Sequence, residues 1–174
     1  MRGGHEDRLH RRVAIETFWL PALWRDLGEA CAGLSPRGGV ELNWRSPAPD
    51  VTLSSDRWRI RIAVLNLVRN ALVATERGSV TAECLADEDG VTIVVRDTGV
   101  GIAPDEQRRI LEPHPRSGAG VGILTVLRFA TDLGGTVALH SEPGRGSEFR
   151  VTLSLVLPPP ALARDAPIRT SRSG

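Results

Sequence analysis

The sequence predicts a mixed α/β fold, in which about five or more strands form one layer and three longer helices cover one of its faces. Two observations predict this fold. Apolar residues recur at helical spacing in three segments, and shorter apolar or alternating segments lie between glycine-containing turns. A chain of 174 residues with 41% hydrophobic content is long enough for one domain with a sizeable core.

The first predicted element is a helix from about Leu20 to Leu34, with Pro21 in its first turn. Its apolar residues share one face: Leu20, Leu23, Trp24, Leu27, Ala30, Cys31 and Leu34. Two short strands, 40–44 and 51–53, are predicted next, separated by a loop that contains two prolines.

A second helix is predicted from about 56 to 75, with Ser54 or Ser55 as its N-cap. Its expected apolar stripe consists of Ile62, Leu65, Val68 and Leu72. Gly78 marks the end of this element. Strands 79–86 and 91–96 then form a hairpin through the turn at 87–90.

The second half of the chain is predicted to contain a short helix, a longer one and a final hairpin. The short helix runs over 104–111 and is ended by the prolines that follow it, and the longer helix runs over 121–133. Strands 136–141 and 149–157 are joined by the turn at 142–146. The expected domain therefore spans 13–157, between a flexible N-terminal segment, 1–12, and a disordered tail, 158–174.

The composition argues against several classes of function. A formal net charge of +1, no tyrosine and 4% aromatic residues argue against nucleic-acid binding. Cys31 and Cys84 are too few for a disulfide framework and predict buried thiols in a reducing compartment. The sequence has no apolar run long enough for a membrane span. We therefore expect a cytoplasmic domain without direct membrane contact, which leaves open a membrane-anchored parent protein.

Asn66 and Asn70 lie four residues apart, on one face of the second predicted helix. A carboxamide oxygen is a neutral, hard ligand that suits Mg²⁺, which binds largely through waters and substrate phosphates. The alternative is a pair of asparagines that face solvent or bond to a loop, and for the pair taken alone this alternative is favoured.

Asp97 follows an apolar strand, so its carboxylate is expected to be desolvated unless it is paired. Such an acid can accept a hydrogen bond from an exocyclic amine such as N6 of adenine, and Gly99 and Gly101 would leave room for the base. The alternative is an ordinary Asp-Thr-Gly turn.

Glycines 118, 120 and 122 alternate with other residues directly before the third long helix. Backbone N–H groups at such a helix start can bind an anion. The pattern is neither the dinucleotide fingerprint nor a P-loop, because no apolar strand leads into it and no Gly-Lys-Ser/Thr follows it. A further glycine pair, Gly144 and Gly146, lies at the predicted entry to the last strand, where a hairpin turn is the favoured interpretation.

Four motifs thus occur in order: Asn-x3-Asn-Ala from Asn66, Asp-x-Gly-x-Gly from Asp97, Gly-x-Gly-x-Gly from Gly118, and Gly-x-Gly-Ser-x-Phe from Gly144. Together they resemble the N, G1, G2 and G3 boxes of the catalytic ATP-binding domain of bacterial sensor histidine kinases. That family belongs to the superfamily of gyrase B, Hsp90 and MutL. The resemblance covers about 14–157, and residues 109–113 look like the start of the F box.

The resemblance implies a two-layer α/β sandwich, the Bergerat ATP-binding fold, with ATP on the helical face of a mixed, mostly antiparallel sheet and beneath a mobile lid. It implies that Asn70, with Asn66, holds Mg²⁺ and that Asp97 binds adenine N6, with Ser147 assisting through a water. The other implied nucleotide contacts are Gly99, Gly101, Ile102, Gly118, Gly120, Val121, Gly122 and Arg116.

The same resemblance implies a branch of the superfamily. The ATP-hydrolysing members have a glutamate as general base where this chain has Asn66, so no residue of this chain is assigned as catalytic. The γ-phosphate would pass to a histidine on a helical phosphoacceptor domain, in the same parent chain or in a separate protein. A response regulator would then receive the phosphate indirectly.

Two departures from the family pattern leave an alternative open. The lid is short and continues as His-Pro-Arg-Ser over 114–117, and Val73 and Ala74 occupy positions that are often basic or aromatic. Arg116, or less favourably Arg69, would have to supply the missing charge. The alternative is a degenerate module that binds nucleotide or a partner without phosphotransfer. An ATP-gated clamp would need intrinsic hydrolysis, against which Asn66 argues.

Overall fold

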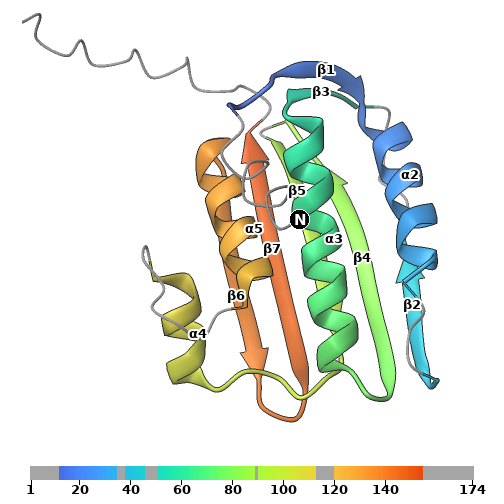
Figure 1. Ribbon diagram of the computed structural model, residues 1–174, viewed down its shortest axis with the longest axis vertical. Helices are drawn as coiled ribbons and strands as arrows, with labels where there is room; N and C mark the ends of the chain where they lie inside the picture. The colour runs from blue at the N-terminus through green and yellow to red at the C-terminus, as the bar shows by residue number, and fades with distance from the viewer. Residues whose placement is uncertain (1–11, 35–37, 46–50, 89, 113–119, 155–174) are drawn as a thin grey trace, which may run out of the picture.

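The computed structural model describes residues 12–34, 38–45, 51–88, 90–112 and 120–154. Its centre is a five-stranded sheet in the order β2-β4-β5-β7-β6 (Figure 1). β2 pairs in parallel with β4, and the other neighbours pair antiparallel. The strands are β2 (Val40–Trp44), β4 (Gly78–Ala86), β5 (Gly90–Asp97), β6 (Thr136–Glu142) and β7 (Gly146–Ser154). The prediction of a mixed, mostly antiparallel sheet is confirmed.

Three long helices lie over one face of this sheet, as predicted (Figure 1). They are α2 (Leu20–Ala32), α3 (Arg57–Ala74) and α5 (Val121–Asp132), and the shorter α4 (Pro104–Leu111) lies beside β6. Side chains alternate along each strand, so every second residue faces the helices. On β5, for example, Val91, Ile93 and Val95 are buried in this layer. The opposite face of the sheet is mostly polar, with His140 of β6 exposed on it and Val94 of β5 buried.

A small second sheet was missing from the sequence prediction. Strand β1 (Glu16–Trp19) pairs antiparallel with β3 (Thr52–Ser55), and α2 begins directly after β1. Phe18 is the buried residue of β1, whereas Trp19 is 48% exposed. A four-residue strand with one buried side chain gives a weak sequence signal, because its pairing partner lies far along the chain.

Helix α3 corrects two expectations. Its N-cap is Asp56 rather than Ser54 or Ser55, because the Asp56 side chain accepts a hydrogen bond from the Arg59 N–H at 3.0 Å. The expected apolar stripe is also wrong in part: Val68 is buried, but Ile62, Leu65 and Leu72 are only partly buried. The face packed into the core consists of Arg59, Ile60, Ala63, Val64, Leu67, Val68 and Ala71.

Arg59 is a charged residue within this core face and is 3% exposed. Its guanidinium pairs with Asp56, with 3.4 Å between Nε and Oδ2, and with Asp132 at the end of α5. It also lies over the Phe129 ring, 4.9 Å from the ring centroid. The backbone N–H of Ala14, before β1, donates to the same Asp56 carboxylate at 2.9 Å. This ion cluster therefore connects α3, α5 and the chain segment before β1.

The remaining differences from prediction are small. β7 begins at Gly146, three residues before the predicted start, and α2 ends at Ala32, before Leu34. Cys31 and Cys84 are buried and free, as predicted, and burial raises the pKa of their thiols to about 11 and about 12. No helix in the described ranges is both long and apolar enough to span a membrane. The two predicted terminal segments lie almost entirely outside those ranges.

Candidate functional site

Asp97 lies at the end of β5 with its side chain on the helical side of the sheet and only 8% exposed. Its Oδ1 accepts a hydrogen bond from the Gly99 N–H at 2.9 Å. Burial raises the pKa of this carboxyl, while hydrogen bonds from the Gly99 N–H and from the backbone and hydroxyl of Ser147 act in the opposite direction. A buried carboxylate with these three donors retains capacity to accept one further hydrogen bond, because its two oxygens offer about four lone-pair positions.

The glycine segment after Asp97 passes between the end of α3 and the β6–β7 turn. The Val100 N–H donates to the Ala74 carbonyl at 3.1 Å, and the Val100 carbonyl accepts from the Gly144 N–H at 2.8 Å. A Cβ on Gly99 would lie 2.2 Å from the Ala74 carbonyl oxygen, closer than any side-chain atom can approach. The segment can therefore pack against α3 only because this position has no side chain.

The β6–β7 turn offers a matched test of this close packing. Gly144 and Gly146 have positive φ angles of +79° and +105°, but a Cβ on Gly144 would meet no atom within 4 Å. A Cβ on Gly146 would lie 1.9 Å from the Asp97 carbonyl oxygen. We predict that Gly144→Ala costs about 1–2 kcal/mol of unfolding free energy, the cost of a left-handed L-residue. Gly146→Ala should cost clearly more in urea unfolding, and equal losses would contradict the packing described here.

The two asparagines of α3 face the start of α5. A Cβ on Gly122 would lie 3.1 Å from Asn66 Oδ1 and 3.5 Å from Asn70 Nδ2, so both carboxamides converge on this helix start. α5 begins at Val121, and Gly120 precedes it without any side-chain cap. Helix starts of this kind present backbone N–H groups and a partial positive charge to an anion.

Both halves of the predicted site occupy one region of the structure. Asn70 lies one helical turn before Ala74, and the Ala74 carbonyl binds the segment that follows Asp97. The structure therefore places the buried acid, the asparagine pair and the α5 start on the same side of the sheet. Ser147 is directly opposite Asp97 in the strand register. Gly118 and Arg116, also predicted to contact nucleotide, lie outside the described residues.

Exposed valines border this region. Val73 on α3, Val100 in the glycine segment and Val121 at the start of α5 are 69%, 65% and 75% exposed. Val73 is apolar, so α3 supplies no cation at that position. Arg69, the other candidate on α3, is exposed.

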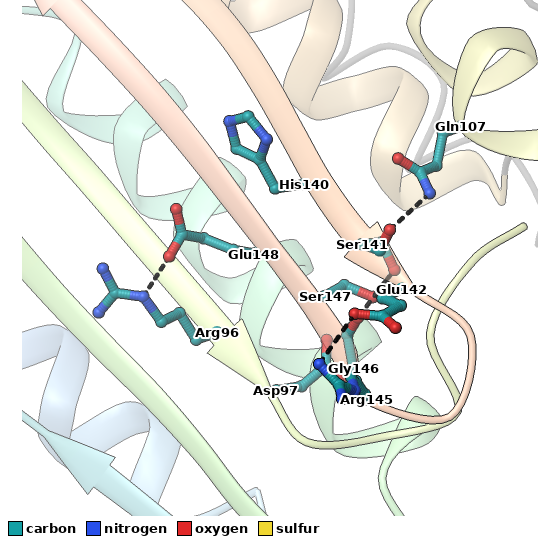
Figure 2. A pocket seen from close by; sticks show the side chains of 10 residues that line it. All are labelled: Arg96, Asp97, Gln107, His140, Ser141, Glu142, Arg145, Gly146, Ser147 and Glu148. Atoms are coloured by element: carbon teal, nitrogen blue, oxygen red, sulfur yellow. Dashed lines mark hydrogen bonds and ion pairs between the residues drawn. The ribbon is translucent and has the colours of Figure 1, made fainter. Parts of the chain in front are cut away.

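A hollow of about 490 Å³ lies at the same end of the sheet (Figure 2). It reaches around the strand ends: Arg96, His140 and Glu148 belong to the open face of the sheet, whereas Asp97 and Ser147 belong to the helical face. Asn66, Asn70 and Gly122 are not among its lining residues. The hollow and the asparagine pair therefore offer two different surfaces on either side of Asp97.

Two polar residues near Asp97 have no place in the predicted motifs. Ser141 of β6 accepts a hydrogen bond from the Ile102 N–H at 2.8 Å, and Gln107 of α4 donates to the Ile102 carbonyl at 2.7 Å. Ile102 itself, predicted as a nucleotide contact, is partly buried and held by these two bonds. Nothing in the spacing of Ser141 or Gln107 indicates a role, because both act through contacts distant in sequence.

Comparison with known proteins identifies relatives of this chain. Residues 55–157 match the family described as histidine kinase-, DNA gyrase B- and HSP90-like ATPase. The histidine protein kinase DivJ of Caulobacter vibrioides is 35% identical over 142 residues, which are 76% of this chain and 24% of DivJ. The sensor histidine kinase RcsC of Escherichia coli K12 is 34% identical over 118 residues, 63% of this chain and 12% of RcsC. The chain thus spans a quarter or less of the length of these relatives.

Solved structures show the same fold. Full-length ShkA in complex with AMPPNP is similar with a TM-score of 0.71 and 32% identity, over 86% of this chain and 34% of ShkA. The catalytic domain of the histidine kinase ThkA, in a nucleotide-free form, has a TM-score of 0.66 and 21% identity. That match covers 83% of this chain and 99% of the ThkA domain, so it establishes the fold over one complete domain.

Proposed function

Because the chain belongs to the family of histidine kinase-, DNA gyrase B- and HSP90-like ATPases, we propose that it binds ATP with Mg²⁺ and delivers the γ-phosphate to a histidine. That histidine would lie on a separate helical phosphoacceptor domain. The proposal rests chiefly on one observation: a pair of asparagines faces the uncapped start of α5, and a buried acid lies on the same side of the sheet. The names of the relatives, histidine protein kinase and sensor histidine kinase, support this branch of the family.

In this proposal Asp97 recognises the adenine base. Its carboxylate is buried, on the helical side of the sheet, and already bonded to Gly99 and Ser147. These three donors, one from Gly99 and two from Ser147, leave acceptor capacity for the N6 amine of adenine. A base with a carbonyl oxygen in place of the N6 amine would instead face the Asp97 carboxylate with a second acceptor. No hydrogen bond could form between the two, and binding would be weaker. Gly99, Gly101 and Ile102 would line the base.

The phosphates would lie between α3 and the start of α5. Gly120, Val121 and Gly122 present the backbone of that helix start, where an anion is stabilised. Asn66 and Asn70 fit Mg²⁺ because their carboxamides are neutral, hard ligands that converge on Gly122. When bound, the ion would neutralise phosphate charge. For Gly118 and Arg116, contact with the nucleotide stays a prediction from the sequence.

Asn70→Ala tests the metal assignment. Removal of one carboxamide should abolish most of the Mg²⁺ dependence of ATP binding, because the bound phosphates then lose their protein-anchored ion. The measurement is calorimetric titration with ATP, with and without Mg²⁺, and Arg25→Ala is a control at an exposed position on α2. If Asn70→Ala binds ATP with wild-type Mg²⁺ dependence, Asn70 does not hold the ion.

Phosphotransfer rather than hydrolysis is proposed because Asn66 cannot act as a general base toward water. The test combines the chain with γ-labelled ATP and a histidine-bearing helical hairpin, taken from the same parent chain or from a separate partner protein. We expect acid-labile label on that histidine and little release of free phosphate by the chain alone. Bound nucleotide with no label on the histidine would disprove phosphotransfer. In the cell, a response regulator would then take the phosphate from that histidine in the cytoplasm.

A second candidate function is favoured by Val73. This residue is apolar and 69% exposed, so α3 carries no cation there toward the proposed phosphate site. A domain with fewer cations at the phosphates could bind nucleotide, or a partner, without transferring phosphate. The same labelling experiment distinguishes the two functions, since label appears on the histidine only if the phosphate is transferred.

A further inference from the structure

A series of hydrogen-bonded residues connects α4 with the buried acid at the end of β5. Figure 2 shows these residues, Gln107, Ser141, Ser147 and Asp97, beside one another. We propose that Gln107 and Ser141 are positioning residues for the Asp97 carboxylate and so set the preference for an amino-bearing base. The proposal rests on the function proposed above, in which Asp97 reads adenine. It adds two residues that no motif of the sequence contains.

The first link joins Asp97 to Ser147. The two residues are directly opposite each other on β5 and β7, and both are buried, at 8% and 7% exposure. The Ser147 hydroxyl and backbone both bond to the Asp97 carboxylate. The orientation of this hydroxyl therefore decides which lone pair of the Asp97 carboxylate accepts its hydrogen bond. It also decides which lone pair stays free to accept a hydrogen bond from a base.

The second link joins Ser147 to Ser141 on the neighbouring strand β6. Their hydroxyl oxygens are 3.0 Å apart, and the Ser141 hydroxyl also lies 2.8 Å from the Gly146 carbonyl oxygen. A serine hydroxyl carries one hydrogen and two acceptor lone pairs. One of the Ser141 lone pairs accepts from the Ile102 N–H at 2.8 Å. Because Ser147 donates its single hydrogen to Asp97, the single Ser141 hydrogen goes either to the Gly146 carbonyl or to Ser147 Oγ, and donation to Ser147 fixes the hydroxyl that binds Asp97.

The third link joins Ser141 to α4 through Gln107. The Gln107 amide nitrogen donates to the Ser141 carbonyl at 2.9 Å and to the Ile102 carbonyl at 2.7 Å, so both of its hydrogens are used. The side chain therefore clamps the two segments that Ser141 also connects. Only one apolar residue of α4, Ile110, is buried, which makes this polar clamp a large part of the attachment of the helix.

Loss of the Ser141 hydroxyl or of the Gln107 amide should weaken recognition of the base rather than binding of the phosphates. Without the Ser141 hydroxyl, the Ser147 hydroxyl loses its hydrogen-bond partner on β6. The Asp97 carboxylate is then no longer held in one orientation. Asn66, Asn70 and the start of α5 share none of these bonds, so contacts to the phosphates should be unaffected. If Ser141 and Gln107 had a purely structural role, their substitution would instead weaken the binding of every nucleotide to the same extent.

The test compares Mg·ATP with Mg·ITP, whose base has a carbonyl oxygen in place of the 6-amino group. The full chain and its Ser141→Ala and Gln107→Leu variants are titrated with both nucleotides. We expect roughly a five- to tenfold loss of ATP affinity in each variant, the scale of one misplaced hydrogen bond. ITP affinity should change by less than about twofold, so the preference for ATP over ITP falls.

Two further variants act as controls. Thr92→Ala removes another hydroxyl that bridges neighbouring strands, 3.2 Å from Thr152 Oγ1, but on the open face of the sheet. It should leave the ATP/ITP ratio at the wild-type value. Ser141→Thr keeps a hydroxyl and should keep most of the preference for ATP.

A wild-type ATP/ITP ratio in folded Ser141→Ala and Gln107→Leu would overturn the inference, and so would an equal loss for both nucleotides. If Ser141→Ala does not fold, Gln107→Leu decides alone, because Gln107 is on a peripheral helix. A wild-type chain that does not prefer ATP over ITP would overturn the proposed adenine site itself, which is a different result from loss of the inference alone.

Discussion

Asp97→Asn is expected to weaken ATP binding by roughly 10- to 100-fold, which corresponds to loss of a hydrogen bond to a charged group. Asparagine keeps one oxygen for the Gly99 N–H, but it replaces the other acceptor with a donor. A donor there faces the N6 amine of adenine unfavourably and the carbonyl of inosine favourably. Calorimetry with both nucleotides should therefore show ATP affinity falling and ITP affinity unchanged or higher.

The same variant should keep the fold, and its stability relative to the wild type should depend on pH. Burial raises the pKa of Asp97 in the folded state, so its ionisation costs folding free energy. This cost is absent at a pH below the ordinary aspartate pKa of about 3.9, and it is complete above the raised folded pKa. The unfolding free energy of Asp97→Asn, relative to wild type, should thus rise with pH. ATP binding as tight as wild type would show that Asp97 does not contact the base.

Arg59→Met is expected to cost about 3–5 kcal/mol of unfolding free energy, the loss found when one partner of a buried ion pair is removed. Methionine fills most of the same volume but leaves Asp56, which is 1% exposed, without its cation. It also removes the connection from α3 to Asp132 and Phe129 on α5. Urea unfolding monitored by tryptophan fluorescence measures the loss.

Arg57→Met is a matched control, two residues earlier in the same helix. Arg57 pairs with Asp26 at 3.0 Å, but both side chains are about 40% exposed. An exposed pair contributes about 0–1 kcal/mol, so this variant should remain close to wild type. If the two variants were equally stable, the Arg59 ion cluster would not stabilise the fold more than the exposed Arg57–Asp26 pair does. Adding Asp56→Asn to Arg59→Met should recover part of the loss, because it removes the unpaired charge.

The local parts of the fold were predictable from the sequence because each depends on neighbouring residues. The β4–β5 hairpin and the three long helices follow from alternation, periodicity and glycine-containing turns. The cap of α3 was not predictable, because two serines and Asp56 occur in succession and any of them can cap a helix. Its core face was misjudged because two overlapping sets of residues have helical spacing, and packing against the sheet decides between them. Strand β1 depends on a partner far along the chain.

The candidate site divides in the same way. Asn66, Asn70 and Asp97 stand in compact motifs with fixed spacing, so their positions on α3 and β5 could be expected. Gln107 and Ser141 could not, because Gln107 contacts Ser141 across 34 residues of sequence and Ser141 contacts Ile102 across 39. Only the fold brings these residues together. The convergence of both asparagines on Gly122 is likewise a tertiary contact between α3 and α5.

The most direct test of the central claim is to locate bound ATP by amide chemical shifts in an ¹⁵N-labelled chain with Mg²⁺. We expect the changes to centre on Gly99, Gly101 and Gly122 and on the side-chain amides of Asn66 and Asn70. Changes confined to the open-face lining of the hollow, Arg96, His140 and Glu148, would contradict it. That result would place the nucleotide on the opposite face of the sheet and remove the proposed roles of the asparagine pair and the α5 start.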